Sequence, residues 1–121
     1  MPQSEVLALL PESIRLHSIS TREIVLPEPA ALQAIDYFEE EGLLILGWEG
    51  WIKTEDGRVG HGTAPQGTAS LEALSVGEAA HICRTSIPNH AQAWRREFPN
   101  TTDALHFCLT VRTTRVGKQV K

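Results

Sequence analysis

This sequence lacks long apolar runs and the residue patterns of export signals and metal sites. None of its 121 residues lies in an apolar stretch near the ~20 residues that cross a bilayer, so we expect no membrane partner. The opening Met-Pro-Gln-Ser-Glu-Val has no basic region followed by an apolar core, so we expect a cytoplasmic protein. Neither His-x-x-x-His nor Cys-x-x-Cys occurs, and we expect no metal ion and no other cofactor.

Cysteine is scarce, with only Cys83 and Cys108 in the chain. Without an export signal the two are expected to be reduced, buried thiols, with a single disulfide between them as the alternative. A nucleophilic cysteine needs an exposed, electropositive setting. Cys108 fits that requirement better than Cys83, because it alternates with apolar residues on the expected wetter face of a strand, beside His106 and Arg112.

Residues arranged for catalysis are also missing. Glu49 together with Glu55 or Asp56 would supply two carboxylates for general acid/base chemistry. Nothing in the sequence adds a partner base, an oxyanion donor or a nucleophile elbow. We therefore expect no catalytic residue and a protein that is not an enzyme.

The charge is distributed unevenly along a chain whose net charge is −4. Residues 1–78 contain 13 acids and four bases, whereas residues 79–121 contain two acids and seven bases. Either the two halves interleave and their charges mix, or one face of the molecule is acidic and attracts a basic partner. Nucleic-acid binders usually have a clearly basic domain, so we expect no nucleic-acid partner.

Two helices are predicted from their termini and their apolar spacing. The first spans 28–41, begins between Pro27 and Pro29 and ends before Gly42. The second spans 75–98, starts with a Ser75/Glu78 capping box and keeps its apolar phase through Pro88, where we expect a kink. Their apolar stripes consist of Ala31, Leu32, Ile35 and Phe38, and of Val76, Ala80, Cys83, Ile87, Ala91, Trp94 and Phe98.

Strands account for most of the remaining chain. Residues 43–54 read as a buried strand, Asp56-Gly57 as a type I′ hairpin turn, and 58–62 as the returning strand. Residues 105–111 alternate between apolar and more polar side chains, which predicts a half-buried strand. Weaker patterns suggest strands at 14–19 and 22–26 after a short helix at 4–10. The sequence predicts one domain, 1–121, of the α+β class: two layers, with an antiparallel sheet of about four to five strands and the two main helices packed on it.

Two of the three tryptophans fall in the strand segment Leu-Leu-Ile-Leu-Gly-Trp-Glu-Gly-Trp at 43–51. In a regular strand Trp48 and Trp51 point to opposite faces. A bulge at Gly50 would instead bring both indoles to one face, and a glycine there can also mark a close backbone approach. The sequence leaves both arrangements open.

This segment carries a resemblance to a known class of proteins. Leu43–Gly62, with the core Gly-Trp-Glu-Gly-Trp-Ile, the Asp-Gly turn and Val59-Gly60-His61, is similar to small bacterial immunity proteins encoded beside polymorphic toxins, including contact-dependent growth-inhibition systems. The similarity extends through Gln66-Gly67-Thr68, the long helix to Trp94 and the strand Phe107-Cys108-Leu109-Thr110-Val111, or roughly residues 28–112. It implies a cytoplasmic, non-enzymatic protein that binds and blocks the toxic C-terminal domain of one cognate toxin, often a nuclease.

The acids of the first half of the chain are then candidates for toxin contact, because the active site of a nuclease is basic. Tryptophan is enriched among binding hot spots, which adds Trp51. The candidate toxin-binding residues are Glu39, Glu40, Glu41, Glu49, Trp51, Glu55 and Asp56. One alternative is a small-ligand-binding domain or small enzyme with a pocket at the Trp48/Trp51 strand. Another is an RNA-associated domain with a basic patch of Arg84, Arg95, Arg96, Arg112 and Arg115, against which the overall acidity argues.

Overall fold

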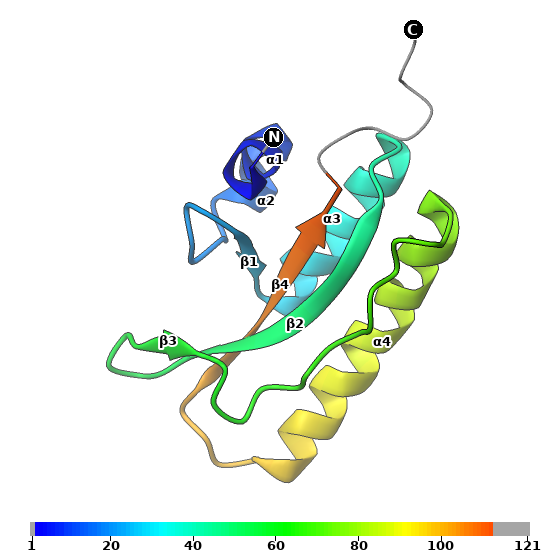
Figure 1. The fold of residues 1–121 in the computed structure, drawn as a ribbon. Coiled ribbons are helices and arrows are strands. Elements are labelled where there is room, and N and C mark those ends of the chain that lie inside the picture. Colours follow the sequence, from blue (N-terminus) through cyan, green and yellow to red (C-terminus); the bar gives the residue numbers. More distant parts are fainter. Residues whose placement is uncertain (1, 113–121) are drawn as a thin grey trace, which may run out of the picture.

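The computed structural model describes residues 2–112 (Figure 1). Arg115, one of the basic residues considered above, lies outside this range. The helices and strands follow one another as α1 (Gln3–Leu9), α2 (Glu12–Arg15), β1 (Ile24–Leu26), α3 (Glu28–Glu40), β2 (Ile45–Lys53), β3 (Val59–Gly60), α4 (Val76–Glu97) and β4 (Ala104–Val111). Among these helices, none combines the length and the hydropathy that a bilayer crossing requires.

The strands form one antiparallel sheet in the order β1-β4-β2-β3. The last strand, β4, lies between β1 and β2 and pairs with both. Helices α3 and α4 lie on one face of this sheet, while no helix of the described chain covers the opposite face (Figure 1). We call the latter the open face. The predicted two-layer α+β fold, with four strands and two main helices, is therefore confirmed.

Both main helices turn small and apolar side chains toward the core, because these residues recur at helical spacing. α4 runs through Pro88 as one continuous helix, as predicted, while the kink expected near Pro88 stays a prediction. Its start is the predicted capping box: Glu78 N–H donates to Ser75 Oγ at 3.1 Å, and Ser75 N–H donates to Glu78 Oε1 at 3.0 Å. The buried residues are Ala30, Ala31, Ala34, Ile35 and Phe38 on α3, and Ala79, Ala80, Cys83, Ile87, Ala91 and Trp94 on α4.

Ion pairs between α3 and α4 join acids of the first half of the chain to bases of the second. Arg84 of α4 lies 3.0 Å from Asp36 and is also paired with Glu39 on α3. Arg95 lies 2.7 Å from Glu28, at the other end of α3. At these positions the two halves interleave and their charges mix, as the first of the two interpretations held.

The N-terminal segment differs from the prediction. The expected strand at 14–19 is wrong, because Glu12–Arg15 forms the short helix α2 after Pro11, and Ile14 packs into the core. Helix α1 precedes it and lies beside β1 (Figure 1). The side chain of Gln3 exchanges two hydrogen bonds with the backbone of Val111, at 3.0 and 2.7 Å. That amide takes the place of a strand neighbour for Val111, which lies beyond the first residue of β1, because Ile24 pairs with Leu109.

The loop between β3 and α4 covers the free edge of β2. Gly50, Thr68 and Leu71 take part in backbone hydrogen bonds that join β2 to residues 65–71. A Cβ atom at Gly67 would lie 1.8 Å from the Trp48 carbonyl oxygen, and Gly67 has φ +97°, so only glycine fits there. Gly50 also lies against this loop, which confirms the close backbone approach. The loop thus protects an edge that would otherwise be open to other strands.

The hairpin is present, but its turn is placed one residue earlier than predicted. Gly57 N–H donates to the carbonyl of Thr54, so Glu55 and Asp56 are the two central residues. Gly57 follows with φ +92°, and Thr54 then pairs with Arg58 at 2.8 Å. A three-residue loop whose last residue is left-handed replaces the expected two-residue type I′ turn. The returning strand shortens to Val59–Gly60.

Candidate functional site

The register of β2 against β4 decides where the two strand tryptophans point. Trp48 pairs with Leu109 and Trp51 with His106, and the only register shift lies between Ile45 and Gly47. With no bulge at Gly50, the two indoles point to opposite faces of the sheet. The two indoles therefore cannot line one pocket together. A hollow along this strand is bordered by Trp48 but not by Trp51, and its other lining residues are Leu46, Gly47, Glu49, Gln66, Thr68 and Thr110.

Trp48 belongs to the core beneath α4. Its side chain is 3% exposed, and its ring contacts those of Phe107 and His90 edge to face, with centroids 5.2 Å away in each case. The indole Nε1–H donates to Ser86 Oγ at 2.8 Å. The Trp48 side chain thus makes its contacts within the protein and has a structural role.

Trp51 lies on the open face, half-buried, beside two polar neighbours. Its Nε1–H donates to Oε2 of Glu49 at 3.1 Å. The ring of His61 packs against it edge to face, with centroids 5.7 Å apart and an interplanar angle of 71°. His61 Nδ1 is 3.2 Å from the carbonyl oxygen of Gly50, which anchors that imidazole to β2. We call Glu49, Trp51 and His61 the indole–carboxylate cluster.

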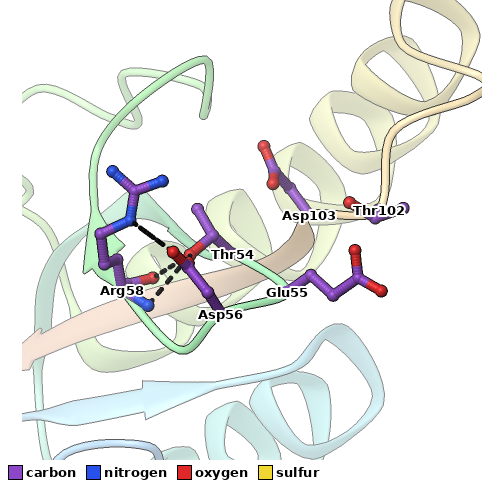
Figure 2. A pocket seen from close by; sticks show the side chains of 6 residues that line it. All are labelled: Thr54, Glu55, Asp56, Arg58, Thr102 and Asp103. Atoms are coloured by element: carbon purple, nitrogen blue, oxygen red, sulfur yellow. Dashed lines mark hydrogen bonds and ion pairs between the residues drawn. The ribbon is translucent and has the colours of Figure 1, made fainter.

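A second group of candidates lies at the hairpin tip, around an open hollow between the hairpin and the α4–β4 loop (Figure 2). Asp56 contacts Thr54 and forms an ion pair with Arg58 at 3.1 Å. The Thr54 hydroxyl, followed by the Arg58 guanidinium, lowers the pKa of the Asp56 carboxyl. The hollow is lined by Thr54, Glu55, Asp56, Arg58, Thr102 and Asp103.

The three acids at the end of α3 lie apart from these groups. Glu39 is paired with Arg84, which explains a carboxylate at a helix C-terminus without reference to a partner protein. Glu40 is exposed, and Glu41 is the residue that ends the helix. They belong to the helical layer, whereas Glu49 and Trp51 lie on the open face. The structure therefore brings Glu49 to Trp51 and Glu55 to Asp56, but does not join Glu39–Glu41 to either pair.

The expected wetter face of β4 is wrong at two of its positions. His106 is 7% exposed and Cys108 is 2% exposed. Burial, and then the nearby carboxylates of Glu23 and Glu49, raise the pKa of the Cys108 thiol to about 12. Burial also lowers the pKa of His106. Cys108 is thus neither exposed nor electropositive, and it is unsuited to nucleophilic chemistry. Cys83 is buried as expected, and both thiols are free.

Sequence reasoning missed the residues that complete both candidate groups. His61 and Asp103 are distant from Trp51 and Asp56 in the sequence, and no spacing pattern connects them. Only the Gly-His-Gly context of His61, where the chain loosens after the hairpin, hinted at a contact residue. Among residues 2–112, no three His, Cys, Asp or Glu side chains are grouped closely enough to hold a metal ion.

Comparisons with known proteins give no further guidance on the role of these groups. No family model, no curated protein and no solved structure matches this chain.

Proposed function

We propose that this chain is an immunity protein that binds the toxic C-terminal domain of a cognate polymorphic toxin, of the contact-dependent growth-inhibition type, in the cytoplasm. The proposal starts from the resemblance carried by Gly-Trp-Glu-Gly-Trp-Ile and the segments that follow it. We further propose that the toxin is a nuclease, since a basic active site complements an acidic inhibitor surface.

The observation that carries the proposal is that an exposed Glu49 and a half-buried Trp51 lie side by side on the open face. A half-buried tryptophan beside an exposed carboxylate provides both an apolar anchor and a charge for a basic partner. Glu55 and Asp56 lie further along the same strand direction, roughly 20 Å from Glu49 at about 3.3 Å per residue. One standard interface covers ~800 Å² on each partner, so a single toxin domain is wide enough to contact both Glu49 and the hairpin tip.

Co-expression tests the proposal directly. The chain is produced with the C-terminal domain of the toxin encoded immediately upstream, and growth and complex formation are measured. We expect the chain to restore growth and to co-purify with the toxin domain at one-to-one stoichiometry. Absence of both rescue and association would refute the proposal.

Charge-reversal variants then test which surface binds. Glu49→Lys should slow association at low salt, because it places a cation where the partner is basic. Glu97→Lys makes the same charge change at an exposed position in the last turn of α4 and serves as the matched control. Glu40→Lys examines the end of α3, and its effect should be smaller than that of Glu49→Lys. Equal effects of all three variants would show that only net charge matters.

A further inference from the structure

The indole–carboxylate cluster has a fixed geometry that an exposed side-chain pair does not ordinarily have. Residues 49 and 51 point to the same face of β2, and the Trp51 N–H holds one carboxylate oxygen of Glu49 at 3.1 Å. That bond places the carboxylate at the edge of the indole. Within residues 2–112 the second oxygen, Oε1, makes no hydrogen bond, so its acceptor capacity faces solvent.

His61 provides a second contact to the Trp51 indole, in addition to the hydrogen bond with Glu49. Its ring packs against the indole, and its Nδ1 is anchored at the Gly50 carbonyl. The indole is therefore restrained both through its N–H and by a neighbouring ring, while part of its surface stays exposed. An anchor that is ordered before binding loses less conformational entropy when the partner arrives.

An aromatic surface with a carboxylate fixed at its edge matches a guanidinium better than an ammonium. The planar guanidinium of arginine stacks on an aromatic ring and donates in the same plane to a carboxylate. Lysine offers a compact charge on a flexible stem and lacks that planar fit. The nearest cation along this strand is Lys53, and within residues 2–112 Glu49 forms no ion pair with it or with any other cation.

We infer that Trp51 and Glu49 form a recognition site for one arginine side chain of the partner protein, with His61 as a positioning residue. The guanidinium stacks on the Trp51 indole and donates hydrogen bonds to the Glu49 carboxylate. This inference rests on the proposed function and specifies the chemistry of its interface. It involves no covalent step.

A double-mutant cycle tests the site. The toxin domain is recovered by denaturing its co-expressed complex and refolding it, and each of its arginines is changed to lysine in turn. We expect one of these changes to weaken binding roughly tenfold or more in the wild-type background, as expected for a hot spot. With Trp51→Leu or Glu49→Gln the same arginine change should have little further effect, because the interaction is already lost.

Controls separate local effects from unfolding. Thermal denaturation verifies that each variant folds, and Trp51→Phe, which keeps an aromatic face, should bind more tightly than Trp51→Leu. His61→Ala should weaken binding less than Trp51→Leu does. In the His61→Ala background, the change of the critical toxin arginine to lysine should still weaken binding measurably. Glu97→Gln, on the helical layer, should leave binding unchanged.

The possible failures can be told apart. A complex in which every arginine change is additive with Trp51→Leu overturns the arginine site while leaving the immunity proposal intact. The absence of any complex refutes the proposed function and this site with it. If the isolated protein dimerises and Trp51→Leu abolishes the dimer, the open face binds a second copy, which also overturns the inference.

Discussion

The indole N–H of Trp48 donates a 2.8 Å hydrogen bond to the hydroxyl of Ser86, joining the centre of β2 to the middle of α4. Trp48 is 3% exposed, so this bond satisfies a donor that has almost no access to water. The sheet and α4 are in this way held together by a directional hydrogen bond as well as by apolar packing. The opposite face of the same strand presents Trp51.

Removing this bond should destabilise the fold. Ser86→Ala leaves the buried Trp48 N–H without a partner, and we expect the free energy of unfolding to fall by about 1–3 kcal/mol. Urea denaturation followed by circular dichroism measures the change. Ser13→Ala, at an exposed position on α2, is the control and should stay within about 0.5 kcal/mol of the wild type. In a Trp48→Phe background, Ser86→Ala should cost less, and an unchanged cost would show that the bond does not contribute.

Alanine substitutions at three glycines should separate backbone strain from steric overlap. At Gly60 a Cβ atom meets nothing, and no unusual φ is present, so the change should be nearly neutral. At Gly57 there is equal space but φ is +92°, which costs about 1–2 kcal/mol for alanine. At Gly67 the same strain adds to a contact of 1.8 Å with the Trp48 carbonyl oxygen, so Gly67→Ala should be the most damaging. Chemical denaturation gives the order, and a Gly67→Ala variant as stable as Gly60→Ala would contradict the path of the loop along β2.

The capping box of α4 should make a pH-dependent contribution to stability. The Ser75 backbone N–H, followed by its hydroxyl, lowers the pKa of Glu78 below its ordinary value of 4.5. A carboxyl whose pKa is lowered on folding stabilises the folded state fully above the unfolded pKa, and this contribution disappears as the pH falls through the folded pKa. Glu78→Gln should therefore lower the melting temperature at pH 7 and have a smaller effect near pH 3.

A second variant checks that the cap itself is responsible. Ser75→Ala removes the side-chain acceptor for the Glu78 N–H, and helix caps of this type contribute about 1 kcal/mol. Ser75→Asp restores an acceptor and should recover most of the loss at neutral pH. Equal stability of the alanine and aspartate variants would show that the helix start is held by other contacts.

Both thiols should be unreactive in the folded protein. Burial raises the pKa of Cys83 to about 11 and that of Cys108 to about 12, so neither is a thiolate at pH 8. A disulfide-exchange reagent at pH 8 should label no thiol in the native protein and two after denaturation. Rapid labelling of Cys108 in the native state would show that the open face is more accessible around β4 than its burial indicates.

Local patterns in the sequence determined the main elements of this fold. Helical spacing, the Ser75/Glu78 pair and the proline and glycine positions at the helix ends predicted α3 and α4, because these features act within a few residues of one another. Apolar runs likewise predicted β2 and β4, and the Asp-Gly pair located the hairpin. The segment around Ile14 was predicted wrongly, because its few apolar residues fit a short helix turn as well as a strand.

Only the tertiary structure decided what each candidate residue does. Whether Trp48 and Trp51 share a face depends on the register between β2 and β4, and strands so far apart in the sequence leave no local trace of their register. The pairing of β1 with β4 likewise buries Cys108 beside Glu23, and the packing of α3 against α4 brings Glu39 into contact with Arg84, away from the other candidate acids. The sequence determined which residues form helices and strands through short-range backbone preferences, whereas long-range packing determined which side chains remain on the surface for a partner.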